Sequence, residues 1–126
     1  MVAYNFKRRF VEPILRGWKQ QTIRARGRRI HAKEGSELQL YTGQRTPNCT
    51  LIAKATCTRV DEAMIAVDAD GIGAIALNGI HLSTDEMERF ARQDGFLNLD
   101  DMAGFWRAEH GEGNFIGLVI QWELNQ

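Results

Sequence analysis

Residues 14–31, which read ILRGWKQQTIRARGRRIH, hold the most distinctive pattern in the chain. The stretch is strongly basic and contains no acidic residue. The basic residues that follow its Gly-Trp pair are Lys19, Arg24, Arg26, Arg28 and Arg29. Such a concentration of positive charge in a chain of net charge zero suggests an anionic ligand. We therefore expect this segment to form the wall and rim of a site for a phosphate-bearing or nucleobase ligand.

Charge is distributed unevenly between the two halves of the chain. Residues 1–59 hold 13 Lys and Arg against 3 Glu and no Asp, whereas residues 60–126 hold 3 Arg against 13 Asp and Glu. An asymmetry of this size suggests an anionic partner for the basic half. The alternative is that the two halves interleave in one fold and neutralise each other.

Length and composition predict a single soluble domain over residues 1–126, with the proportions of an ordinary globular protein. No apolar run approaches the roughly 20 residues that a transmembrane helix needs. The N-terminal sequence MVAYNFKRRF has no apolar region of the kind that follows the basic start of a secretory signal. We expect a cytoplasmic protein without membrane contact, and the sequence leaves its oligomeric state open.

The cysteines and histidines predict neither a disulfide nor a metal site. Cys49 and Cys57 lie eight residues apart in a predicted strand, which separates their Cα atoms by about 26 Å. A disulfide requires about 7 Å or less, so we expect two buried free thiols in a reducing compartment. His31, His81 and His110 have no partner at metal-ligand spacing, so no metal or cofactor is expected.

The basic stretch is expected to begin in a short helix at about residues 11–16, which tolerates Pro13 in its first turn and ends at Gly17. Helical spacing predicts that Phe10, Ile14 and Trp18 face the core. Trp18 borders the basic residues, so the alternative is a platform on which a base stacks.

Residues 19–24 read as a short strand followed by a basic loop at 25–35. Alternation places Lys19 and Ile23 on one face, and Thr22 and Arg24 on the other. A twist after Gly17 would bring Lys19 and Thr22 together, but their spacing does not demand it.

The remaining strands are predicted from alternation and from turn residues between them. They span residues 36–42, 50–57, about 59–67, a short segment from 74, and a closing strand at 115–124. In the first of these, Leu38 and Leu40 are expected to point inward. In the last, the inward residues are expected to be Ile116, Leu118, Ile120 and Trp122.

Two capped helices are predicted between the short strand and the closing strand. Ser83 is a good N-cap, Glu86 stands at the capping-box position, and Gly95 ends the helix. Residues 97–107, LNLDDMAGFWR, repeat the pattern of residues 82–92, LSTDEMERFAR. The expected fold is therefore α+β: a small, partly open β-barrel of about five to six mostly antiparallel strands, with a short N-terminal helix and two peripheral helices.

A family resemblance adds to this interpretation. Gly17, Lys19, Thr22 and Arg24 form a Gly-x-Lys-x-x-Thr-x-Arg motif, and Gly35, Leu38, Leu40 and Tyr41 follow as Gly-x-x-Leu-x-Leu-Tyr. This order resembles the ASCH (activating signal cointegrator homology) domain of the PUA-like superfamily, most specifically over residues 10–57. The resemblance implies a PUA-like barrel with a cleft lined by the Gly-x-Lys motif, and a role in binding RNA.

The resemblance also implies a possible enzyme. One bacterial branch of small ASCH proteins is an amidohydrolase of acetylated cytidine that uses a Lys and a Thr of this motif, which Lys19 and Thr22 match. The branch also uses a Glu just before a later helix, where this sequence has Ile80 and His81, with Glu86 nearby. Other ASCH proteins are described as cleaving RNA.

Three hypotheses follow for the function. The leading one is a module that binds RNA, single-stranded nucleic acid or a nucleotide, with Tyr41 stacking on a base. Its phosphate ligands would be Lys19, Arg24, Arg26, Arg28 and Arg29. The alternative is a small hydrolase in which Lys19, its pKa lowered by burial, acts with Thr22 and with Glu86 or His81 as the acid. The third is a domain whose basic edge meets an acidic protein.

Overall fold

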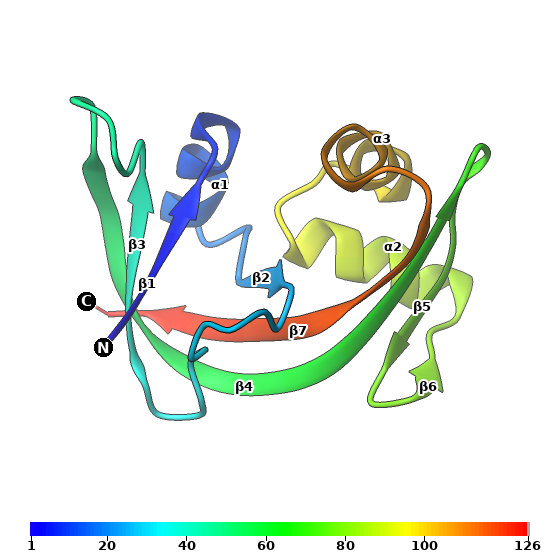
Figure 1. The fold of residues 1–126 in the computed structure, drawn as a ribbon, viewed down its shortest axis with the longest axis horizontal. Coiled ribbons are helices and arrows are strands. Elements are labelled where there is room, and N and C mark those ends of the chain that lie inside the picture. Colours follow the sequence, from blue (N-terminus) through cyan, green and yellow to red (C-terminus); the bar gives the residue numbers. More distant parts are fainter. Residues whose placement is uncertain (126) are drawn as a thin grey trace.

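The computed structural model describes residues 1–125. It shows an α+β fold built mostly of one sheet (Figure 1). Within these residues, seven strands, a 3₁₀ turn and three helices follow one another. In chain order they are β1 (Val2–Phe6), η1 (Arg8–Phe10), α1 (Val11–Leu15), β2 (Gln21–Arg24), β3 (Glu37–Thr42), β4 (Thr50–Asp68), β5 (Gly71–Leu77), β6 (Ile80–His81), α2 (Thr84–Gln93), α3 (Leu99–His110) and β7 (Gly113–Leu124).

The centre of the sheet is a long antiparallel ladder between β4 and β7, which curves across the whole molecule in Figure 1. One half of β4 pairs with β3 and the other half pairs with β5, while β7 runs along its opposite side. The register shifts between Cys57 and Arg59, and such a bulge bends a strand. The two strands predicted at 50–57 and 59–67 are therefore one bent strand.

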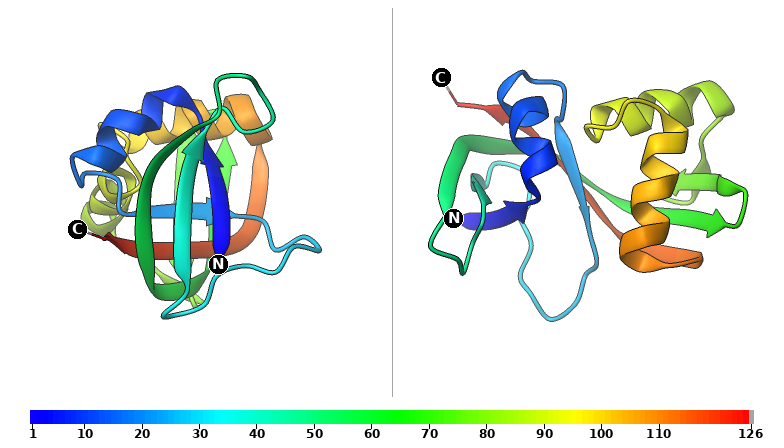
Figure 2. Two further views of the ribbon diagram at one scale, coloured as in Figure 1. Left: turned by 90° about the vertical axis from the view of Figure 1, so that its left-hand side faces the viewer. Right: turned by 90° about the horizontal axis from the view of Figure 1, so that it is seen from above.

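The sheet does not close into a barrel. Three of its strands have one partner each: β1 pairs in parallel with β3, β2 pairs with β7, and β6 pairs with β5. In the left panel of Figure 2, β2 and β7 run across β1 and β3. The α+β class and the three helices are confirmed, but the predicted small barrel of five to six strands is instead an open, strongly curved sheet. We call the unpaired junction between β1 and β2 the seam.

Strand β1 is absent from the sequence-based interpretation, although its pattern is readable. Tyr4 and Phe6 are buried while Asn5 between them is exposed, which is the alternation of a half-buried strand. At five residues the strand is short, and the basic residues that follow it at 7–9 dominate the local composition.

The two predicted helix starts are confirmed. The Glu86 N–H donates to Ser83 Oγ at 3.2 Å, and the Ser83 N–H donates to Glu86 Oε1 at 2.8 Å, which completes the capping box of α2. The Asp101 N–H donates to the Asn98 side chain at 2.8 Å at the start of α3. Both signals are local in sequence, so they identify the helix starts without knowledge of the tertiary fold.

A continuous apolar core lies between the sheet and the helices, and Leu38 and Leu40 face it as predicted. Three burial predictions are wrong. Trp18 is 59% exposed because Gly17, at φ +76°, turns the chain out of helical spacing. Ile116 is 64% exposed because the side chain of its neighbour Phe115 packs on Trp106 of α3, and successive side chains of a strand point to opposite faces. Cys49 is also exposed, in the turn before β4; both cysteines are free.

In the part of the chain that the structure describes, no helix combines the length and the apolar character needed to cross a bilayer.

The close approach of β2 and β7 generates a stability prediction. A Cβ added at Gly117 would lie 3.0 Å from the backbone carbonyl carbon of Arg24 and 2.8 Å from the Phe115 ring. Gly117→Ala should therefore lower the free energy of unfolding by about 1–3 kcal/mol, as measured by urea denaturation.

Gly104→Ala is the matched control, because a Cβ at this position in α3 meets nothing within 4 Å. Alanine is the better helix former, so this variant should gain about 0.5–1 kcal/mol. A Gly117→Ala protein as stable as the wild type would show that β2 and β7 do not approach so closely.

Candidate functional site

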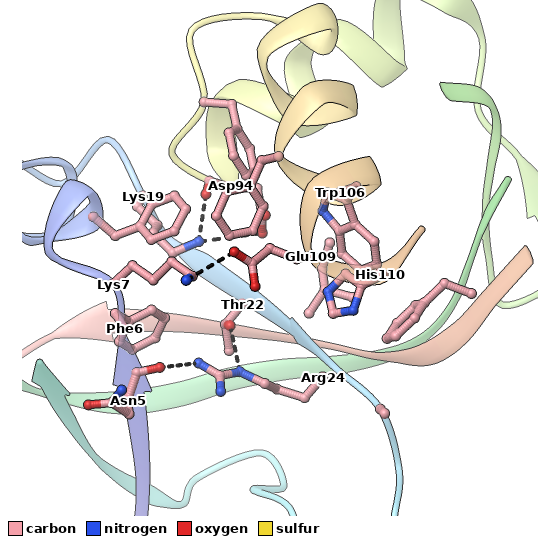
Figure 3. Close-up of a pocket in the computed structure, with 16 residues that line it drawn as sticks. Asn5, Phe6, Lys7, Lys19, Thr22, Arg24, Asp94, Trp106, Glu109 and His110 are labelled. Carbon is pink, nitrogen blue, oxygen red and sulfur yellow. Dashed lines mark hydrogen bonds and ion pairs between the residues drawn. The ribbon is translucent and has the colours of Figure 1, made fainter. Parts of the chain in front are cut away.

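A cavity of about 310 Å³ opens at the seam between β1 and β2 (Figure 3). This volume is near the lower end of the range of about 300–1,000 Å³ that small-molecule sites occupy. Strands β1 and β2 and the segment before β2 supply one side, and η1, α3, the start of β7 and the loop after α2 supply the rest. The aromatic residues of its lining are Phe6, Phe10, Phe96, Phe105, Trp106 and Phe115.

Lys19 and Asp94 form a buried ion pair in the wall of this cavity. Lys19 is only 3% exposed, and its Nζ donates to the Asp94 backbone carbonyl at 2.5 Å and lies 3.7 Å from Asp94 Oδ1. The ammonium also lies 4.6 Å from the centre of the Phe10 ring. Asp94 is thus the acid that accompanies Lys19, and it comes from the C-terminal end of α2.

The local backbone explains why these two residues meet. The Gln20 N–H donates to the Gln93 carbonyl at 2.8 Å, which ties the start of β2 to the end of α2. Gly95 follows Asp94 at φ +94°, and a Cβ there would lie 3.0 Å from the Lys19 side chain. Glycine is therefore required at position 95 both for its conformation and for the space that the lysine chain occupies.

Burial moves both pKa values of the pair. It lowers the pKa of Lys19 to about 8, with the attraction of Asp94 opposing the shift. It raises the pKa of Asp94 to about 6, with the attraction of Lys19 opposing that shift. Near neutral pH the pair is charged, and each member lies close to the pH at which its charge is lost.

Gln21 is a second partner of the Asp94 carboxylate. Its Nε2 donates to Asp94 Oδ1 at 3.3 Å, and the side chain is almost fully buried. Gln121 of β7 in turn donates to Gln21 Oε1 at 3.5 Å. The carboxylate orientation is therefore set by β2 and β7 as well as by Lys19.

Thr22 and Arg24 line the same cavity as Lys19. The Arg24 Nε–H donates to Thr22 Oγ1 at 3.0 Å, and Nη2 donates to the Asn5 carbonyl of β1 at 2.8 Å (Figure 3). Arg24 thereby bridges the seam. The prediction that alternation separates Lys19 from Thr22 and Arg24 is wrong, because β2 begins only at Gln21 and Lys19 lies in the preceding turn.

A second ion pair lies beside the cavity at its exposed side. Lys7 Nζ lies 2.9 Å from Glu109 Oε1 of α3, and both side chains are exposed. His110, one residue further along α3, packs against Trp106 with ring centres 4.4 Å apart, and burial lowers its pKa. These side chains connect α3 to the strand side of the cavity.

The rest of the predicted basic surface lies outside the cavity lining. Arg26 pairs with Glu62 at 2.7 Å, and Arg28 is exposed in the loop. Arg29 lies over the Tyr4 ring at 4.4 Å and donates to the Ala3 carbonyl of β1. Tyr41 donates its hydroxyl to Gln39 on β3 at 3.1 Å. Of the predicted phosphate ligands, only Lys19 and Arg24 are brought together.

The predicted acids are also elsewhere. Glu86 is engaged in its capping box, and His81 is exposed on β6; neither lines the cavity. Asp94 has one recognisable signal in the sequence. It ends a helix, where the helix dipole disfavours negative charge, so an acid directly before Gly95 favours a cationic partner.

Among residues 1–125, no three His, Cys, Asp or Glu side chains gather in a group able to hold a metal ion.

The buried pair predicts an unusual pH dependence of stability. Folding raises the pKa of Asp94 from 3.8 to about 6, so this group removes stability as pH rises from about 4 to 6. Folding lowers the pKa of Lys19 from 10.5 to about 8, so stability returns as pH rises from about 8 to 10. Relative to a Lys19→Met/Asp94→Asn variant, the wild type should be least stable between pH 6 and 8, as measured by urea unfolding.

The same two substitutions at exposed Lys33 and Asp70 control for the general loss of charge. A difference between wild type and the Lys19/Asp94 variant that stays flat from pH 4 to 10 would contradict the coupled, buried pair.

Comparisons of the chain with models of known protein families, with curated proteins and with solved structures find no match. The site is accordingly described by its residues and distances. It is a small cavity with aromatic walls, a buried Lys19–Asp94 pair, and a threonine hydroxyl held by an arginine.

Proposed function

We propose that the protein binds a nucleobase in the seam cavity, as part of RNA, another single-stranded nucleic acid or a nucleotide. The observation that carries this proposal is a buried Lys–Asp pair in the wall of a small cavity with aromatic sides. The resemblance of the Gly-x-Lys-x-x-Thr-x-Arg motif to ASCH domains of the PUA-like superfamily favours the same ligand class.

The aromatic lining suits a flat heterocycle, because bases stack on Phe and Trp rings in single-stranded recognition. The polar groups of Lys19 and Asp94 suit the hydrogen-bonding edge of such a base. A carboxylate accepts from the exocyclic amine of cytosine, and an ammonium donates to a ring carbonyl or nitrogen. Asp94 and Lys19 supply this complementary pair within one cavity.

The cations near the exposed side suit the sugar-phosphate part of such a ligand. Lys7 and Arg24 line the cavity together with Lys19, and an ammonium or guanidinium binds phosphate readily. Lys7 is paired only with exposed Glu109, so a phosphate can compete for it at little cost.

A second candidate is hydrolysis of a nucleoside amide, and the specific observation that favours it is the lowered pKa of Lys19. A lysine with a pKa of about 8 is partly neutral at physiological pH and can act as a base. Thr22 lines the same cavity as Lys19, and in this candidate its hydroxyl would orient the substrate carbonyl. The Arg24 guanidinium, which already donates to Thr22, would stabilise the developing negative charge on the carbonyl oxygen.

In this reaction the C–O bond to water forms as Lys19 accepts a proton from the water. The C–N bond then breaks, and the proton passes from Lys19 to the departing amine. Asp94 would hold the Lys19 side chain in place throughout and stabilise its protonated ammonium form.

Binding is tested by calorimetric titration with cytidine 5′-monophosphate. Lys19→Met should weaken binding by about 10- to 100-fold, because the loss of a hydrogen bond from a charged group costs about 1.5–3 kcal/mol. Lys33→Met, an exposed lysine outside the cavity, should bind as the wild type does. Equal affinities of the Lys19→Met and wild-type proteins, both folded by circular dichroism, would exclude the seam cavity as the site.

Turnover is tested with N4-acetylcytidine by following release of cytidine. If the hydrolase candidate is correct, the rate should rise with pH around a midpoint near 8, as Lys19 loses its proton. Thr22→Val should retain binding and lose most of the rate. Binding of the compound with no cytidine released between pH 7 and 9 would leave only the binding function.

A further inference from the structure

A second cavity, of about 570 Å³, lies between the end of α1 and the end of α2, and the seam cavity does not include it. We call it the Trp18 groove. Its apolar lining comprises Pro13, Trp18, Phe96 and Leu97, and Arg89 and Arg92 of α2 lie at its side. Trp18 and Leu97 are both largely exposed, so the groove presents an apolar surface to solvent.

Trp18 is held as a flat platform. The backbone N–H of Trp18 donates to the Pro13 carbonyl at 2.9 Å, and this bond fixes the backbone after α1. The guanidinium of Arg16 lies over the indole at 5.3 Å and is itself paired with Glu12 at 2.6 Å. Trp18 therefore has Arg16 over its ring and is still 59% exposed, whereas Trp106 and Trp122 are buried.

The charge beside the groove identifies the kind of partner that suits it. Arg89 takes part in no ion pair among the described residues, and Arg92 has only a loose contact of 4.0 Å with Glu88. An exposed aromatic face beside guanidinium groups matches a nucleotide, which offers a stacking base and a phosphate together. An uncharged apolar peptide would leave these arginines without a partner.

The two cavities are neighbours, because Phe96 lines both of them. The consecutive residues Trp18 and Lys19 line different cavities, so the turn after Gly17 serves both sites.

We infer that the Trp18 groove is a stacking subsite for a second base of a single-stranded nucleic acid whose other base occupies the seam cavity. The inference rests on the proposed binding of a nucleobase beside Lys19 and narrows the ligand to an oligonucleotide. A mononucleotide fills only one of the two sites.

The test compares two ligands: a fluorescently labelled RNA hexamer measured by anisotropy, and cytidine 5′-monophosphate measured by calorimetry. The hexamer should bind more tightly than the mononucleotide. Trp18→Ala should weaken hexamer binding by about 5- to 150-fold, the range expected for loss of one stacked base, and leave mononucleotide binding unchanged. Trp18→Phe should retain part of the hexamer affinity.

Ile80→Ala is the matched control, because Ile80 is a similarly exposed apolar side chain outside the groove. Arg89→Gln should reduce the salt dependence of hexamer binding, with a log–log slope smaller by about 0.7 if Arg89 contacts one phosphate.

Unchanged hexamer affinity in Trp18→Ala would overturn the inference and leave the groove to a protein partner. Equal weakening of both ligands would also overturn it, because the groove would then not be a separate subsite. If the hexamer is affected by Trp18→Ala but neither ligand is affected by Lys19→Met, the groove is supported and the proposed function of the seam cavity fails.

Discussion

The buried contact between Lys19 and Asp94 is the interaction on which the geometry of the site depends. An ammonium removed from water needs partners on several sides, and here they are a carbonyl, a carboxylate and the face of Phe10. Both oxygen groups belong to Asp94, so α2 must end beside the turn that precedes β2. The position of the helices against the sheet is therefore fixed by an electrostatic contact as well as by apolar packing.

A buried ion pair is an expensive way to hold two elements together, since apolar side chains of similar volume often serve stability as well or better. Its retention here coincides with an opening in the sheet. Because β1 and β2 do not pair, the backbone leaves room for a cavity, and Lys19 and Asp94 lie in its wall. Groups with displaced pKa values in a cavity are characteristic of sites that bind or transform a ligand. The missing strand pairing and the buried ion pair are thus two aspects of one site.

The sequence predicts what is encoded locally. The capping box of Ser83 and Glu86 is contained in four residues, and the motif that predicts Lys19 and Thr22 as candidate site residues is contained in eight. Asp94 is different, because its partner is 75 residues away and only the tertiary fold brings them together. Trp18 shows the limit of periodicity, since one glycine with positive φ ends the helical spacing on which its predicted burial relied. Charge counting likewise identifies a basic loop. It does not identify which of its arginines form ion pairs or hydrogen bonds within the protein.

The arginines at the seam have a consequence for the behaviour of the protein at high concentration. Ala3 and Asn5 lie two residues apart on the free edge of β1, so their carbonyls point the same way, and Arg29 and Arg24 donate to them. Unoccupied carbonyls on an edge strand invite a strand from another molecule to pair with them, which is a route to aggregation. The two guanidinium groups take the place of such a strand and protect the edge. A polyanion that draws Arg29 away from Ala3 would free this carbonyl, so binding of a polyanion would favour self-association through the β1 edge.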